Sequence, residues 1–175
     1  NRHARIEGKV LRLRFRGKSG RMRDIVCSDK VLVRCVRRMQ DLPGQHLFQY
    51  IDEDGTPVPV DSTDVNAYLR ETMGQEFTAR NFRTWAGSAL GFGMLIANPN
   101  IPMKELLQEV ADQLGNTPAI VRKSYIHPAV IGAAKGEPPV AALPRRLPRK
   151  TRWLSRVERG LLMFLESPRA IAAVG

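Results

Sequence analysis

The sequence predicts an α+β fold that is mainly helical, with an antiparallel β-hairpin near the N-terminus packed on a helical core. Two patterns support this prediction. Apolar and basic residues alternate with a period of two over residues 10–16, whereas apolar residues recur at helical spacing from residue 28 onward. The length of 175 residues and the 43% hydrophobic content fit one ordinary globular domain with its own core.

The N-terminal hairpin is expected over residues 9–27. The stretch VLRLRFR at 10–16 has the alternation of a half-buried strand, 17–20 is turn chemistry, and residues 21–27 alternate again. The apolar edges are expected to face a core (Leu11, Leu13, Phe15, Met22 and Ile25), and the arginines to face solvent or phosphate. Charge alternation alone also fits a solvated strand face. The short apolar run at 48–50 is a candidate third strand.

Helices are expected throughout residues 28–134. The first runs from an N-cap at Ser28 to Gln40, with Val31, Cys35 and Met39 on its apolar stripe. Further capping residues and helix-ending glycines or prolines delimit helices at 61–73, 78–98, 102–114, 117–125 and 129–134. With the hairpin, this helical core makes a predicted domain at 1–134.

The chain beyond residue 134 has a different composition. Residues 135–154 are rich in proline and basic residues, which is typical of a linker that stays extended and mobile unless it docks. In residues 155–175, Ser155 is expected to cap a last helix whose apolar face packs on the core.

The charge of the chain indicates a polyanionic partner. Lys and Arg number 28 against 17 Asp and Glu, which gives a net charge of +11, and the basic residues are dense between residues 2 and 23. No apolar run is long enough to span a bilayer, so we expect no membrane partner. Two cysteines and three scattered histidines predict neither a disulfide framework nor a metal site.

Few residues are candidates for chemistry. Lys18 lies in the hairpin turn, and although 17–19 echoes the end of a phosphate-binding loop, the required upstream glycine is missing. Arg83 lies between Phe82 and Trp85, so we expect it to be partly buried with an anionic partner, either a phosphate or a structural carboxylate. Tyr125 is a candidate nucleophile, although a lone tyrosine is more often a packing residue, here against Val121 and Ile131.

Three segments together resemble the catalytic domain of type IB DNA topoisomerases, in the bacterial and poxvirus-like branch. They are FRGKSG at 15–20, FTARNFRTW at 77–85 and LGNTPAIVRKSYIHP at 114–128. The resemblance covers most of residues 1–130 and implies the fold shared with tyrosine recombinases. Carried over by position, it implies catalytic roles for Lys18, Arg83, Asn116 and Tyr125, and DNA contacts by Arg16, Ser19, Arg80, Arg122 and Lys123.

The resemblance implies ATP-independent relaxation of supercoiled duplex DNA through a 3′-phosphotyrosyl intermediate. An ordinary phenol, with a pKa near 10, is a poor nucleophile at neutral pH, so cations must stabilise the developing charge. Because the phosphodiester energy is kept in the covalent link, we expect neither a nucleotide cofactor nor a metal. We also expect a monomer that works in the cytoplasm on the nucleoid.

The pattern departs from the family in one respect. The family has a further catalytic arginine, in a motif upstream of the stretch that begins here at Asn1, so we expect the given chain alone to lack full activity. Tyrosine recombinases are a rival class, but they show His-x-x-Arg where this chain has Arg80 to Arg83, and Leu-Gly-His where it has Leu-Gly-Asn at 114–116. A non-catalytic DNA-binding fragment is a third hypothesis.

Overall fold

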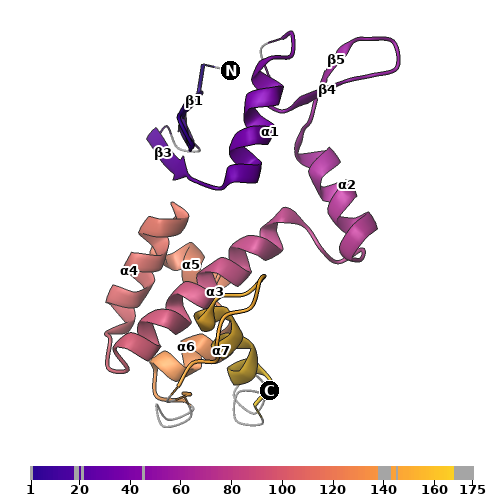
Figure 1. The fold of residues 1–175 in the computed structure, drawn as a ribbon. Helices are drawn as coiled ribbons and strands as arrows, with labels where there is room; N and C mark the ends of the chain where they lie inside the picture. The colour runs from indigo at the N-terminus through magenta and orange to yellow at the C-terminus, as the bar shows by residue number, and fades with distance from the viewer. Residues whose placement is uncertain are drawn as a thin grey trace. The chain divides into compact units, whose positions relative to one another are not determined.

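The computed structural model describes residues 2–17, 20, 22–44, 46–137, 143–144 and 146–167. The chain separates into two compact units, Asn1–Met73 and Gly74–Gly175, which are described one at a time (Figure 1). Both contain regular elements, so the mixed architecture of helices and small antiparallel sheets agrees with the predicted class. That the two units act together as one catalytic domain stays a prediction.

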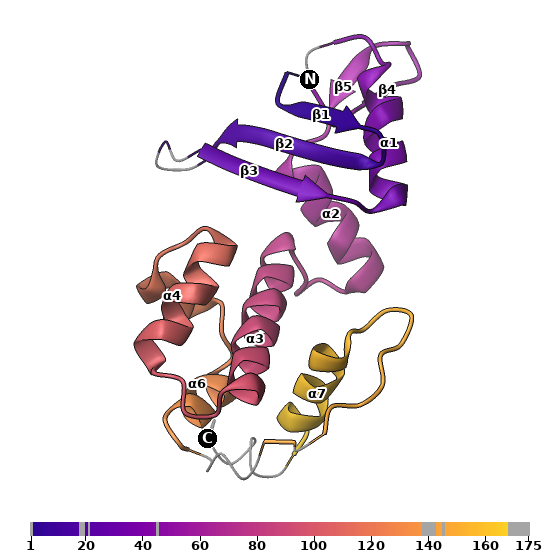
Figure 2. The same ribbon diagram turned by 60° about the vertical axis from the view of Figure 1, so that its left-hand side comes forward.

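The first unit is built on a three-stranded antiparallel sheet in the order β1 (Ala4–Glu7), β2 (Val10–Arg16) and β3 (Met22–Cys27) (Figure 2). Helix α1 (Lys30–Gln40) covers one face of this sheet. The core between them contains Ala4, Leu11, Val33 and Val36. The β2–β3 hairpin therefore lies where the period-two pattern predicts it.

The prediction that residues 48–50 add a third strand to the hairpin was wrong. Residues 49–51 form β4 (Gln49–Ile51), which pairs with β5 (Pro57–Pro59) in a separate two-stranded sheet. The intervening turn favours this local pairing, because Asp52 Oδ1 accepts hydrogen bonds from the backbone N–H groups of Asp54 and Thr56. The strand that completes the main sheet is β1, joined to β2 by a tight turn at Gly8, whose φ of 60° suits glycine.

The predictions of which apolar side chains of β3 and α1 face the core were also wrong in part. Met22 pairs with Arg16, so it lies on the arginine side of the sheet and is 54% exposed, and Ile25, on the edge strand, is 46% exposed. Helix α1 turns Val33 and Val36 inward and leaves Val31 74% exposed. Its N-cap is Asp29, which accepts a hydrogen bond from the Leu32 N–H, and not Ser28.

Helix α2 (Ser62–Met73) ends the first unit. Asp61 Oδ1 accepts hydrogen bonds from the N–H groups of Thr63 and Asp64, which is the N-terminal capping expected from the sequence. Backbone hydrogen bonds from Asp64 and Thr63 lower the pKa of Asp61 because they favour its ionised form.

The second unit is a helical assembly around α3 (Ala79–Ala97). Helices α4 (Met103–Leu114), α6 (Pro128–Ala134) and α7 (Arg156–Leu165) pack on α3, and α5 (Pro118–Ser124) packs on α4 (Figure 1). Fully buried side chains join them into one core, which includes Phe92, Leu95, Leu106, Val110, Val121, Val130 and Leu161. This core holds the segments that carry most of the predicted site.

The helix ends in this unit follow the capping signals. Thr78 and Asn81 form a capping box at the start of α3, and Gly115, with a φ of 65°, ends α4 in the left-handed conformation. Thr117 Oγ1 accepts a hydrogen bond from the Ile120 N–H, and Pro118 occupies the first turn of α5. These caps fix where the short α5 helix begins, and therefore where Tyr125 lies at its end.

The described part of the proline-rich segment is docked. Leu143 is buried in the core of the second unit, and Leu147 packs beside it. Helix α7 contributes Leu161 and Phe164, whose ring lies 5.5 Å from that of Phe92 between centroids. The expected helical residues 168–175 lie outside the described residues.

One hydrogen bond ties α7 to α3 beside the start of both helices. Trp85 Nε1 donates to Glu158 Oε1 at 2.8 Å, while Glu158 Oε2 accepts from the Ser155 N–H at 2.8 Å. The hydrogen bonds from Ser155, and then from Trp85, lower the pKa of Glu158 because they stabilise its carboxylate. The ionised form therefore stabilises the folded state.

This lowered pKa predicts a pH-dependent contribution to stability. The contribution of Glu158 should be present above its unfolded-state pKa, about 4.3, and should be lost as the pH falls through the lower folded-state value. In urea unfolding, Glu158→Gln should therefore lower the free energy of unfolding at pH 7, with a deficit that shrinks toward acid pH. Glu166→Gln, at the other end of α7, is the matched control. Parallel pH profiles for wild type and Glu158→Gln would contradict this assignment.

Candidate active site

Tyr125 lies at the C-cap of α5, with its side chain half-buried. Its backbone N–H donates to the Val121 carbonyl at 2.9 Å, so the last turn of the helix fixes its position. The Cζ atoms of Arg80 and Arg83 each lie 6.0 Å from the centroid of the tyrosine ring. Three residues that the sequence singled out are therefore brought together.

The two arginines reach the tyrosine because of their spacing. They are three residues apart near the start of α3, so both project on the same side of the helix. The capping box formed by Thr78 and Asn81 fixes the helix start just before them. The first turns of α3 therefore present two guanidinium groups to one ring.

The backbone around Tyr125 is bound closely to α3. A Cβ atom added to Gly87 would lie 2.3 Å from the Tyr125 carbonyl oxygen, so only glycine permits this approach. Before the tyrosine, Thr84 Oγ1 donates to the Ser124 carbonyl at 3.2 Å. After it, the His127 N–H donates to Ser88 Oγ at 2.9 Å. The connection between α5 and α6 is thus held to one helix at three successive points.

Arg83 differs from its expected burial. Its side chain is exposed, and Phe82 beside it is also exposed, so the expectation of a partly buried arginine was wrong. The reason is that the inward side of α3 begins further along the helix, with Gly87, Ser88 and Gly91. Among the described residues, no carboxylate forms an ion pair with Arg83.

Tyr125 combines the two roles considered for it. It packs in part against the apolar core, as a structural tyrosine would. Its ring, however, also faces two guanidinium groups, and among the described residues its hydroxyl makes no hydrogen bond. A hydroxyl that is left free beside two cations can approach an anionic substrate.

The other predicted residues of this unit surround the tyrosine less directly. Asn116 is half-buried in the turn between α4 and α5, and its side-chain amide donates to the Leu114 carbonyl at 3.1 Å. No hydrogen bond in the described part of the chain joins it to Tyr125 or to the arginines. Arg122 and Lys123 are exposed in the last turn of α5.

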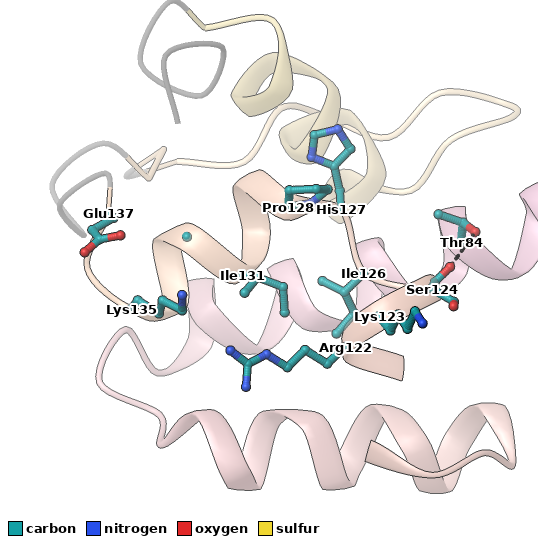
Figure 3. Close-up of a pocket in the computed structure, with 11 residues that line it drawn as sticks. Thr84, Arg122, Lys123, Ser124, Ile126, His127, Pro128, Ile131, Lys135 and Glu137 are labelled. Carbon is teal, nitrogen blue, oxygen red and sulfur yellow. Dashed lines mark hydrogen bonds between the residues drawn. The ribbon is translucent and has the colours of Figure 1, made fainter. Parts of the chain in front are cut away.

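A pocket of about 530 Å³ adjoins the tyrosine segment (Figure 3). Its charged lining consists of Arg122, Lys123, Lys135 and Glu137. Thr84 and His127, which take part in the hydrogen bonds between α3 and the tyrosine segment, also line it. Burial lowers the pKa of His127, which favours the neutral imidazole, and His127 Nδ1 accepts a hydrogen bond from the Ala129 N–H. With three cations against one carboxylate, the lining has a net positive charge, which suits an anion.

Two predicted residues are not described, and one belongs to the other unit. Lys18 and Ser19 lie outside the described residues, so their roles stay predictions. Arg16 is exposed at the end of β2 in the first unit. The supporting roles of Thr84 and Ser88 were not predicted from the sequence. The available signal for Ser88 was a polar residue within the apolar part of α3.

The described residues contain no helix long and apolar enough to cross a membrane. Nor do their histidines, cysteines and carboxylates gather into a group of three or more that could hold a metal ion.

The approach at Gly87 can be tested by substitution. Gly87→Ala should force the Tyr125 carbonyl away from α3 and lower the free energy of unfolding by about 1–3 kcal/mol, as expected for overpacking. Amide exchange at Tyr125 and His127 should become faster. Gly91→Ala is the matched control, because its added Cβ would meet only ordinary contacts of 3.6 Å. If Gly87→Ala and Gly91→Ala lower the free energy of unfolding equally, the close approach at Gly87 does not determine the position of the Tyr125 backbone.

Comparisons with known proteins identify the family of this chain. A family model described as the catalytic core of eukaryotic DNA topoisomerase I matches residues 1–134. DNA topoisomerase 1B of Acanthamoeba polyphaga mimivirus is 31% identical over 140 residues, which cover 71% of this chain and 42% of that protein. The chain thus spans less than half the length of this relative.

Proposed function

This chain belongs to the type IB DNA topoisomerase family, and we propose on that premise that it cleaves and reseals one strand of duplex DNA through Tyr125. The result would be relaxation of supercoiled DNA without ATP. The observation that carries the proposal is the half-buried Tyr125 ring facing two guanidinium groups that have no carboxylate partner among the described residues.

In the proposed cleavage step, Tyr125 Oη attacks the scissile phosphorus. A phosphorus–oxygen bond to the tyrosine forms, the bond to the 5′ oxygen breaks, and the phenolic proton passes to solvent. The negative charge on the non-bridging oxygens grows during this step, and Arg83 can bind two of them with its planar fork. Arg80 supports the same charge from the preceding helical turn, and Asn116 can donate a neutral hydrogen bond.

Lys18 is proposed as the general acid that protonates the leaving 5′ oxygen. Religation is the reverse: the 5′ hydroxyl gives its proton back and attacks the phosphotyrosine. One phosphodiester is exchanged for another, so the strand can be resealed without an energy source. Arg16, Ser19, Arg122 and Lys123 are proposed to hold the neighbouring phosphates.

The finer features of the family resemblance are part of the same proposal. They are the bacterial and poxvirus-like branch, the recombinase-like packing of the catalytic domain, a monomeric state and work on the nucleoid in the cytoplasm. A non-catalytic DNA-binding fragment is the alternative that the first experiment separates, because such a fragment would bind DNA without forming a covalent link.

The first experiment removes the nucleophile. In a chain extended upstream of Asn1 to include the family's further arginine, Tyr125→Phe should abolish the covalent 3′ adduct on denaturing gels, because the phenylalanine ring keeps the packing but lacks the oxygen. DNA binding should stay within a few-fold of the parent. Tyr68→Phe, which alters an exposed tyrosine on α2, is the control. A covalent adduct formed by Tyr125→Phe would place the nucleophile elsewhere.

The second experiment tests the leaving group. Lys18→Ala should slow cleavage of a normal phosphodiester, because the 5′ oxygen then leaves without a proton donor. A substrate with a 5′-bridging sulfur should be cleaved by the variant at close to the parent rate, since a thiolate leaves without protonation. If the variant cleaves both substrates more slowly by the same factor, Lys18 positions the phosphate and is not the acid.

A further inference from the structure

A basic strap leads into α7, ends at the first residue of that helix, and lies outside the part of the chain that the family model matches. The strap comprises residues 146–156, and the match ends at residue 134. It contains five basic residues and no acidic one, namely Arg146, Arg149, Lys150, Arg152 and Arg156. The role of this segment is therefore not given by the family match.

The part of the strap before α7 is held by two arginines of that helix. The Arg156 guanidinium donates to the carbonyls of Leu147 and Pro148 at 3.2 and 3.3 Å, and Arg159 Nη1 donates to the Arg149 carbonyl at 2.6 Å. Further along, Thr151 Oγ1 accepts hydrogen bonds from the N–H groups of Trp153 and Leu154. A segment that is already ordered loses little conformational entropy when it binds a partner.

Among the described residues, no carboxylate neutralises the positive charge of the strap. Carbonyl groups orient the arginines without cancelling their charge, and no carboxylate forms an ion pair with the strap among the described residues. Four of its cations line an open pocket of about 920 Å³, and none of the described lining residues is acidic (Arg146, Arg149, Lys150 and Arg156). This surface favours an anion that can contact several cations at once.

The strap also presents an aromatic ring. Trp153 is 79% exposed, and the Arg152 Cζ lies 4.6 Å from its ring centroid. An exposed indole with a stacked guanidinium is suited to contact with the sugars and bases of nucleic acid. The hydrogen bond from Trp85 to Glu158 holds the first turn of α7 beside the helix that carries Arg80 and Arg83. The strap thus leads to α3, the helix whose two arginines face Tyr125.

We propose that the basic strap binds the phosphate backbone of duplex DNA, as a contact additional to those around Tyr125, with Trp153 packing against the sugar or base edges. The inference relies on the proposed function for the choice of DNA as the polyanion. The cations are spread along an extended segment, which fits a continuous row of phosphates better than one small anion.

The test measures duplex binding as a function of salt. All variants are made in the full chain carrying Tyr125→Phe, so that equilibrium binding is measured without cleavage. The triple variant Arg149→Ala, Lys150→Ala, Arg152→Ala should bind about tenfold or more weakly, and its log–log salt slope should fall by up to about 0.9 for each phosphate that the strap no longer neutralises. Arg149→Lys with Arg152→Lys should keep the slope, and Lys104→Ala on α4 is the positional control. An unchanged slope in the triple variant would overturn the proposal.

A second readout reports on Trp153 directly. Addition of duplex DNA should change the intrinsic fluorescence, and Trp153→Phe, which keeps Trp85, should lose most of that change. Inorganic tripolyphosphate is the competing small anion. If tripolyphosphate displaces duplex DNA from the strap at a concentration comparable to that of DNA phosphate, the pocket is a small-anion site and the proposal fails. Tighter binding of single-stranded than duplex DNA through the strap would also overturn it.

The outcome is separable from that of the proposed function. Suppose that Tyr125→Phe loses the covalent adduct but the triple variant keeps its salt slope. The proposed function would then stand, and only the proposal for the strap would be rejected. A chain that shows the strap effect but never forms the adduct would retain the strap as a DNA contact and reject the cleavage proposal.

Discussion

The site depends on the contact between Gly87 and the Tyr125 carbonyl. The α5–α6 connection can lie against α3 only because a side chain is absent at this point. The hydrogen bonds from Thr84 to the Ser124 carbonyl and from the His127 N–H to Ser88 Oγ are made on either side of it. A short helix of seven residues would hold its last residue poorly by itself, so the neighbouring helix supplies the rigidity that the tyrosine needs.

Charge placement distinguishes the two kinds of arginine in this chain. Arg12 forms a bidentate pair with Asp24, and its hydrogen bond lowers the pKa of that carboxyl group, so both charges are satisfied within the protein. Arg80 and Arg83 face an aromatic ring and have no carboxylate partner within the described ranges. A cation that the fold leaves without a counter-charge keeps its attraction for an external anion, which is what a phosphate-binding site requires.

The sequence predicted best those features that depend on local chemistry. The caps at Thr78, Thr117 and Ser155 and the glycine at the end of α4 are short-range signals, and the structure places them at helix ends. The inward face of α1, the third strand and the exposure of Arg83 were mispredicted, because each depends on which distant segment packs there. The meeting of Arg80 and Arg83 with Tyr125 followed from the family resemblance, since residues some forty positions apart give no periodic signal. The supports from Thr84 and Ser88 required the packed structure.

Glu158 connects the site to the segment that follows the family match. It is the only acidic residue between residues 146 and 159, and its two oxygens accept hydrogen bonds from Trp85 on α3 and from the Ser155 N–H at the start of α7. Both bonds favour the ionised carboxylate and direct it to the interface between these helices. The same contacts therefore hold α7 beside α3, the helix that carries Arg80 and Arg83. They also engage the one carboxylate of residues 146–159 in hydrogen bonds. The other charged side chains between residues 146 and 159 are all cations, and the exposed indole of Trp153 lies among them.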